Sequence, residues 1–292
     1  MQICEHCGIK VQGTFPRLGL IDGEKFTFPK PADILKDIHH HKLDLFTFLQ
    51  HPFRPLGALA GFEVEQDNLA ILQVSTFDHW FGKQVNKDVR NLVRKCEKAG
   101  VKVADSELNT DFVRGVWELN NESKVRMGKR FPHFGTSLEW TRSYIDSFEM
   151  RAIFISAYLG TEMIGFLKMV MDEHQDDKPS YACILEILGK LAHRDKNVTR
   201  ALMAQAVKCC EARGISLLAY DRFQYGSKTD GLQAFKKDLG FERQNVPRYY
   251  VPVTRRGRIA YGLGLHRRLQ EVLPESVSGP LRNLRHALIG KS

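Results

Sequence analysis

The chain has 292 residues, of which 43% are apolar and 26% charged, a globular composition that excludes a disordered or fibrous protein. Its 43 Lys and Arg residues outnumber 34 acidic residues, giving a formal net charge of +9. No apolar run approaches the roughly 18 residues of a membrane helix, and the first residues resemble no secretory signal, so we expect a cytoplasmic protein.

The positive charge is concentrated in residues 254–292, which hold eight cations against two acids. The six cysteines include one adjacent pair, a pattern that favours reduced thiols. Cys4 and Cys7 have metal-ligand spacing, with His6 or His39-His40-His41 as further candidates, but the sequence lacks a second such pair. We therefore expect no metal.

Residues 1–65 contain irregularly spaced Gly, Pro and His and are predicted to form a loop-rich N-terminal lobe. An apolar run at 69–74 predicts a buried strand. Residues 78–99 follow the helical period and end at Gly100, so a helix is expected there. The face of this helix opposite its apolar side is basic and consists of Lys83, Lys87, Arg90, Arg94 and Lys98. Such a stripe is typical either of a solvated surface or of an anion-binding track.

The remaining periodicities predict alternating strands and helices. Residues 123–135 form an unusual loop with four cations, a histidine, two aromatics and no acid. The expected elements are a strand at 101–104, helices at 110–121 and from Thr136 to 149, a hairpin of 152–158 with 163–171, a strand at 182–188, a helix at 199–213, a strand at 215–223, a helix ending at Gly240, and a strand at 246–253.

This order of elements resembles the GNAT acyltransferase superfamily. The segment from Val89 to Val101 and the pairing of residues 236–241 with 247–250 are further similar to FemAB-like transferases, which add amino acids from aminoacyl-tRNA to peptidoglycan precursors. The resemblance covers residues 66–253 and implies an α/β fold with a GNAT-like mixed sheet and helices on both faces. The lobe at 1–65 is then a candidate reduced second GNAT-like unit, and 254–292 is a basic C-terminal tail.

In GNAT proteins the turn after the fourth strand holds the acyl-CoA pyrophosphate on backbone amides. Here that turn, residues 189–200, lacks the usual glycines, whose absence keeps the backbone farther from a phosphate. Side chains are the alternative grip. The candidate donor-binding residues are Arg194, Lys196, Asn197, Thr199 and Arg200.

Acyl transfer to an amine needs a base for the ammonium proton and an acid for the leaving group. Glu186, on the strand before this turn, is the first candidate base, with an exposed strand position as the alternative. His193 is the second candidate base. Tyr225 resembles the tyrosine acid of GNAT enzymes, with simple packing as the alternative. The candidate substrate-binding residues are Arg126, Lys129, Arg130, His133, Tyr220, Arg222 and Tyr249.

The resemblance implies an N-acyltransferase that uses acyl-CoA, or a related phosphate-bearing donor, to modify a small-molecule or cell-envelope amine. An aminoacyl-tRNA-dependent aminoacyltransferase is one alternative. The other is an inactive GNAT-like module that binds RNA or an anionic membrane, at the periphery of the inner membrane, through helix 83–98 and tail 254–292.

Overall fold

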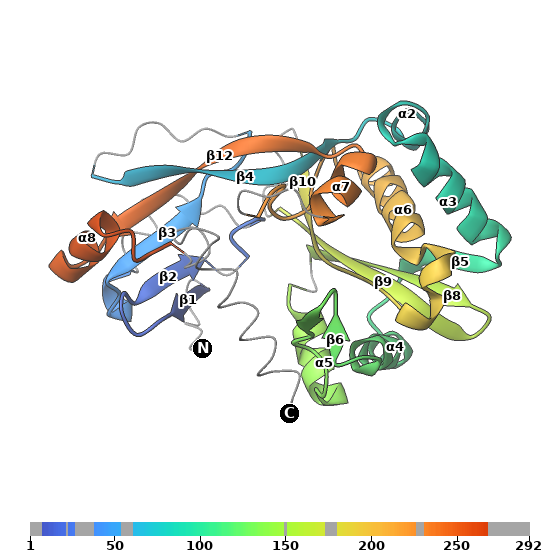
Figure 1. The fold of residues 1–292 in the computed structure, drawn as a ribbon, viewed down its shortest axis with the longest axis horizontal. Helices are drawn as coiled ribbons and strands as arrows, with labels where there is room; N and C mark the ends of the chain where they lie inside the picture. The colour runs from blue at the N-terminus through green and yellow to red at the C-terminus, as the bar shows by residue number, and fades with distance from the viewer. Residues whose placement is uncertain are drawn as a thin grey trace. The chain divides into compact units, whose positions relative to one another are not determined.

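The computed structural model describes residues 8–21, 23–26, 38–53, 61–148, 151–172, 180–225 and 231–267. These residues divide into two compact units (Figure 1). The described part of unit 1 comprises the chain up to Leu69 together with 224–225 and 244–267, and that of unit 2 comprises 70–223 and 231–243. This division differs from the predicted boundaries, because residues 244–253 group with the N-terminal strands.

Unit 1 is built on short strands. Their order is β1 (Ile9–Gln12), β2 (Leu18–Ile21), β3 (Leu45–Leu49) and β12 (Glu242–Pro252), with a parallel β2–β3 pair and antiparallel pairs on either side. Unit 1 also contains a 3-10 turn (Ile38–His41), the first part of β4 (Glu63–Gln73) up to Leu69, and helix α8 (Arg255–Gly262). The sequence predicted only loops for the N-terminal part, because strands of four or five residues between Gly and Pro give too few alternations to detect.

Unit 2 contains a mixed sheet whose strand order is β4-β11-β10-β9-β8-β5. Only the β10–β11 pair is parallel. The bounds are Glu63–Gln73 for β4, of which the residues from Ala70 belong to this unit, Leu217–Ala219 for β11, Tyr181–Gly189 for β10, Glu162–Met171 for β9, Ala152–Leu159 for β8 and Val101–Ser106 for β5.

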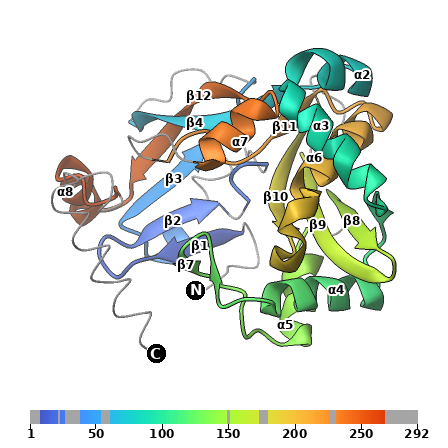
Figure 2. The same ribbon diagram turned by 45° about the vertical axis from the view of Figure 1, so that its right-hand side comes forward.

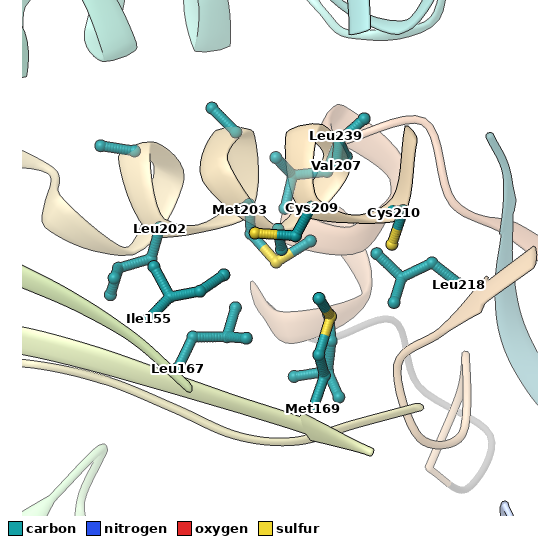
Figure 3. Close-up of a cluster of buried hydrophobic side chains, with 14 of the residues drawn as sticks. Ile155, Leu167, Met169, Leu202, Met203, Val207, Cys209, Cys210, Leu218 and Leu239 are labelled. Carbon is teal, nitrogen blue, oxygen red and sulfur yellow. The ribbon is translucent and has the colours of Figure 1, made fainter. Parts of the chain in front are cut away.

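Helices cover both faces of this sheet, as predicted (Figure 2). Helices α3 (Lys87–Lys98) and α6 (Val198–Ala212) cover one face, and α4 (Thr110–Asn121) and α5 (Leu138–Asp146) cover the other. Helix α7 (Gly231–Asp238) contributes Phe235 to the α3 and α6 side. In the core, Ile155, Leu167 and Met169 of the sheet meet Leu202, Met203 and Val207 of α6 (Figure 3). Cys96, Cys183, Cys209 and Cys210 are buried free thiols, which fits the expected reduced state.

The predicted helix at 78–99 is broken. Thr76 caps a short α2 (Phe77–His79), a π-helical turn follows (Trp80–Gln84), and Asn86 starts α3 as a new N-cap. The Trp80 indole donates to Leu239 O at 2.9 Å and is fully buried, so packing of the indole fixes the turn independently of α3. The Arg90 guanidinium donates to Val85 O at 2.8 Å and satisfies a carbonyl at the break.

Strand β10 carries two irregularities that matter for function. Its register against β9 shifts between Ile184 and Glu186, which is a β-bulge. Its pairing with β11 ends at Cys183, and within the described residues no strand pairs with that edge afterwards. Backbone groups of β10 from Leu185 onward therefore face away from the sheet ladder on one side.

Gly165 on β9 lets α6 approach the sheet closely. A Cβ there would lie 2.6 Å from Val198 Cγ1 and 3.0 Å from Leu188 O, which are stiff neighbours. We expect Gly165→Ala to lower the free energy of unfolding by about 1–3 kcal/mol in chemical denaturation. Gly82→Ala is the matched control, since nothing lies within 4 Å of its added Cβ, and it should be nearly neutral. Equal stability of the two variants would contradict this packing.

Candidate functional site

Glu186 has its carboxylate buried on the α4 and α5 side of β10. Its Oε2 atom has no hydrogen-bond partner among the described residues. Burial raises the pKa of this carboxyl to about 7, and the Tyr144 hydroxyl, Lys168 and Arg126 limit the rise by stabilising the charged form. Sequence alternation alone left an exposed position open, and the structure places the carboxylate inside. A carboxyl with a pKa near neutrality suits a general base.

Lys168 lies directly across the β9–β10 pair from Glu186. Its ammonium is buried and donates to Ile145 O at 2.7 Å, to Ser147 O and to Ser147 Oγ. Burial lowers its pKa to about 8, although Glu186 opposes that shift. The lysine therefore anchors the end of α5 while placing a positive charge next to the candidate base.

An aromatic cluster lies next to the carboxylate. Trp140 and Tyr144 of α5 stack with ring centroids 5.1 Å apart, and His133 meets Tyr144 edge-on at 4.6 Å. Phe131 lies 5.3 Å from His133. Burial lowers the pKa of His133, so its imidazole stays neutral near pH 7. Because Tyr144 also interacts with Glu186, the cluster and the carboxylate form one continuous group of side chains.

The basic loop at 123–135 is a structured hairpin rather than a loop. Strands β6 (Val125–Arg126) and β7 (Lys129–Arg130) pair, and positive φ at Met127 and Gly128 forms the two-residue turn. Of its predicted ligand residues, Arg126 is buried under the hairpin, whereas Lys129 and Arg130 are exposed. In this hairpin the Arg126 side chain is therefore held inside the protein, whereas the Lys129 and Arg130 side chains face solvent.

Arg126 and Glu122 tie the hairpin to the turn after β10. The guanidinium donates to Glu122 Oε2 at 2.8 Å and to Gly189 O at 2.9 Å. The Glu122 carboxylate in turn accepts the backbone N–H groups of Leu191 and Ala192 at 2.7 and 2.9 Å. A carboxylate of the chain itself therefore binds two amides in the turn of residues 189–200, where the resemblance places the pyrophosphate of GNAT proteins.

The predicted donor-binding turn contains a 3-10 helix, η4 (Leu191–Lys196), that the sequence did not reveal. Asn197 stands at the N-cap of α6, yet its backbone is left-handed and its side chain caps no helix amide. Its Oδ1 accepts from Arg200 at 3.1 Å instead. Lys196 pairs with Asp195, and Arg194 is exposed. Thr199 is half-buried. Lys196 and Arg200 are half-buried as well, so Arg194 is the most exposed cation of the predicted set.

His193 does not approach Glu186 through any contact in the structure. Its Nε2 lies 3.1 Å from Glu162, which also pairs with Lys190. The histidine therefore belongs to a partly exposed ionic cluster at the start of β9. This placement favours Glu186 over His193 as the base.

Two of the remaining predicted residues lie in unit 2. Tyr220 is half-buried beside Phe235 and Phe241, and Lys236 lies over its ring at 4.7 Å. The ammonium of Lys236 donates a hydrogen bond to the carbonyl oxygen of Arg222. These contacts bind the end of β11 to α7.

Tyr225 and Tyr249 belong to unit 1. Tyr249 stacks on Phe48 at 5.2 Å and donates its hydroxyl to Gln50 at 3.0 Å, with 5% of the residue exposed. The ring therefore packs in the core of unit 1, and substrate binding by Tyr249 stays a prediction. Tyr225 is half-buried after β11.

Several buried polar atoms on the α4 and α5 side lack a hydrogen-bond partner within the described chain. Buried polar groups are nearly always paired, so an unpaired one is available to a bound molecule. Both side-chain atoms of Asn120 belong to this set although the residue is fully buried. The full set is Asn120 Oδ1 and Nδ2, Arg126 Nε, His133 Nδ1 and Glu186 Oε2.

Sequence reasoning missed Asn120, Glu122, Tyr144 and Lys168. Lys168 could have been found, since it is the one charge inside the apolar run of β9. Asn120 likewise interrupts the buried face of α4. The i,i+4 spacing of Glu122 and Arg126 could have indicated their ion pair, but the backbone amides that Glu122 also binds lie about 70 residues away and gave no signal.

Within the described ranges, no group of three His, Cys, Asp or Glu side chains is arranged to hold a metal ion. Cys4 and Cys7 lie outside those ranges, as do the side chains of His39 and His40. In the same part of the chain no helix is long and apolar enough to cross a bilayer.

No family model matches the sequence, and no curated protein matches it. Solved structures do resemble it. The C-terminal domain of a putative lysylphosphatidylglycerol synthetase from Agrobacterium fabrum is 13% identical with a TM-score of 0.59, covering 87% of this chain and 83% of that one. FemX is 12% identical with a TM-score of 0.58, and the match covers 87% of this chain and 85% of FemX. L-PGS from Bacillus licheniformis is 12% identical with a TM-score of 0.58, and the match covers 84% of this chain and 81% of that one.

At this level of identity the similarity establishes the fold. The chain has the GNAT-like, FemAB-related fold, so the predicted fold class is confirmed. Apart from the β6–β7 hairpin, η4 and α8, which the sequence did not predict, the order of strands and helices from β5 onward is also the predicted one.

The buried carboxyl makes stability depend on pH. A folded pKa near 7 lies above the ordinary value of 4.5, so the folded state binds the extra proton between these values and loses stability as pH rises through them. Glu186→Gln removes this loss. Relative to the wild type, the variant should gain up to about 3 kcal/mol in unfolding free energy between pH 4.5 and pH 7.5. Parallel pH profiles in chemical denaturation would contradict the burial.

Proposed function

We propose that the protein is an acyl-group transferase that uses Glu186 to deprotonate an amine acceptor. The observation that carries this proposal is the buried carboxylate with an unpaired oxygen and a pKa near 7, next to an aromatic cluster and a strand edge without a partner. The fold shared with FemX and with a domain named for lysylphosphatidylglycerol synthesis is consistent with it.

In the proposed reaction, Glu186 Oε2 accepts the ammonium proton of the acceptor. The free amine attacks the acyl carbonyl, a C–N bond forms, and the bond from the carbonyl carbon to the leaving oxygen or sulfur breaks. The backbone amides of β10 beyond Cys183 are placed to stabilise the oxyanion, because their edge of the sheet is unpaired among the described strands. The leaving group takes up a proton from solvent.

The aromatic cluster is the proposed site for the acceptor ammonium. Faces of Trp140 and Tyr144 attract a cation, and the carboxylate beside them supplies the opposite charge. Neutral His133 and the amide of Asn120 add hydrogen-bonding atoms without adding positive charge. These features favour an amine-bearing acceptor at this face, and a small-molecule or cell-envelope amine fits that requirement.

For the donor, the Glu122 contact favours aminoacyl-tRNA over acyl-CoA. A pyrophosphate on the η4 amides would have to displace a carboxylate that also pairs with buried Arg126. The exposed cations Arg194, Lys129 and Arg130 can instead contact a long phosphate backbone.

The alternative of an inactive scaffold is less well supported. Loss of catalysis would remove the need to keep an ionisable carboxylate buried beside Lys168, an arrangement that costs stability when the carboxylate is ionised. Two cations of the α3 stripe already serve the fold: Arg90 donates to Val85 O, and Arg94 lies over the Phe81 ring at 5.5 Å. The stripe is therefore a weaker RNA-binding track than its sequence indicated.

Replacing Glu186 should abolish most of the transfer activity. We expect Glu186→Gln to lower kcat/KM by about 10²–10⁴, and wild-type activity to rise with pH through an apparent pKa near 7. The assay follows transfer from labelled aminoacyl-tRNA, and separately from acetyl-CoA, to lysine or to phosphatidylglycerol vesicles. Glu118→Gln, at an exposed position of α4, is the matched control. Full activity of the folded Glu186 variant would discard the proposed base.

Thermal shift distinguishes the two donors. Ligands that bind only the folded state raise the melting temperature by mass action. We expect aminoacyl-tRNA to raise it more than uncharged tRNA does, and a large excess of acetyl-CoA to leave it unchanged. A clear shift with acetyl-CoA would overturn the tRNA donor and favour acyl-CoA, with Arg194→Ala and Lys196→Ala then testing the phosphate contacts.

A further inference from the structure

Helix α8 and the residues after it are fixed firmly to unit 1. Gly257 lies against β3 so closely that a Cβ would meet Asp44 O at 1.7 Å, and Ala260 is fully buried. Thr254 caps the helix through the Gly257 N–H and donates to Asp44 Oδ1 at 3.0 Å. The helix is therefore held in one orientation, with one face directed at the unit and the other at solvent.

The segment after the helix is fixed as well. The His266 ring stacks on Tyr261 at 4.6 Å and meets Tyr250 of β12 at the same distance. Both His266 and Arg267 pair with Glu65. Residues 254–267 thus form one ordered surface element.

The outward face of this element is apolar. Ile259 is 61% exposed, Leu263 67% and Leu265 49%. Phe15, at 48%, adjoins them through Arg256, whose guanidinium lies over its ring at 5.2 Å. An ordered helix that keeps several large apolar side chains in water indicates a contact surface.

Cations surround these apolar side chains. At 100° per residue, Arg255 and Ile259 lie within about 40° of each other on the outward side, with Arg258 on one flank and Arg256 on the other. Residues 254–267 contain no acid. Of the neighbouring carboxylates, Glu65 is paired with Arg267 and His266, and Glu63 acts on Tyr261. Arg255, Arg256 and Arg258 are exposed.

We infer that this surface, formed by α8, Leu263, Leu265 and Phe15, docks unit 1 on an anionic lipid bilayer. The apolar side chains enter the boundary between headgroups and acyl chains, and the arginines reach the lipid phosphates around them. A nucleic acid would satisfy the cations but leave Ile259 and Leu263 in water, so the combination favours lipid. The inference does not depend on the proposed catalytic function, because none of these residues belongs to the Glu186 site.

Vesicle co-sedimentation of the full chain tests the inference. Wild-type protein should bind vesicles of equal parts phosphatidylglycerol and phosphatidylcholine, and should not bind phosphatidylcholine alone. The triple variant Arg255→Gln, Arg256→Gln, Arg258→Gln should bind the anionic vesicles on the order of a hundredfold more weakly, since each cation near such a surface contributes about fivefold. The double variant Ile259→Ser, Leu263→Ser should also lose binding, most clearly at high salt where the apolar contribution dominates.

The α3 helix supplies a matched control. Replacing Lys83, Lys87 and Lys98 by Gln removes the same charge from an exposed surface of unit 2 and should leave vesicle binding unchanged. Equal loss in the α3 variant, or full binding by both α8 variants, would overturn the inference. If the protein bound tRNA through α8 and did not bind vesicles, the inference would be overturned in favour of a nucleic-acid surface.

Insertion can be measured directly. In Ile259→Trp, anionic vesicles should shift the added fluorescence to the blue, whereas phosphatidylcholine vesicles should not. A shift absent with anionic vesicles in a protein that still sediments with them would show purely electrostatic adsorption and refute insertion. Unchanged melting temperatures confirm that each variant is folded.

Discussion

The arrangement around β10 depends on the cost of placing an ionisable carboxylate inside a protein. Burial raises the pKa of Glu186 to about 7, so near neutral pH the group is divided between charged and neutral forms. Lys168, fixed by carbonyls at the end of α5, limits that cost from the neighbouring strand. The bulge after Ile184 sets the face of β10 on which the carboxylate lies. On that face the carboxylate meets the Tyr144 hydroxyl of α5.

The turn after β10 in the same region is held by contacts within the chain. The turn after β10 has no glycine fingerprint, contains a 3-10 helix, and has its first amides bound by Glu122. Glu122 also holds Arg126, so one carboxylate links α4, the β6–β7 hairpin and the turn. These internal contacts of Glu122 hold the hairpin against the turn after β10.

The two units place different chemistry on different parts of the chain. Unit 2 holds the proposed base, the aromatic cluster and the unpaired polar atoms. Unit 1 holds an ordered, basic and apolar surface at α8 that shares no residue with that site. The cations of the C-terminal tail therefore have different roles. Arg255, Arg256 and Arg258 surround exposed apolar side chains, whereas Arg267 pairs with Glu65.

The sequence by itself determined the fold class, the order of the longer strands and helices from 101 onward, the helix ends at Gly100 and Gly240, and Glu186 as a candidate base. These follow from local periodicity and from backbone conformations that favour glycine. Only the tertiary structure decided that Glu186 is buried and that Lys168 and Tyr144 lie next to its carboxylate. It also decided that Tyr249 packs in a core and that Glu122 binds two backbone amides of the turn after β10. Each of these depends on contacts between segments far apart in the chain, whose energies no local pattern records. The break at Asn86 has the same cause, because burial of Trp80 outweighs the periodicity of a continuous helix.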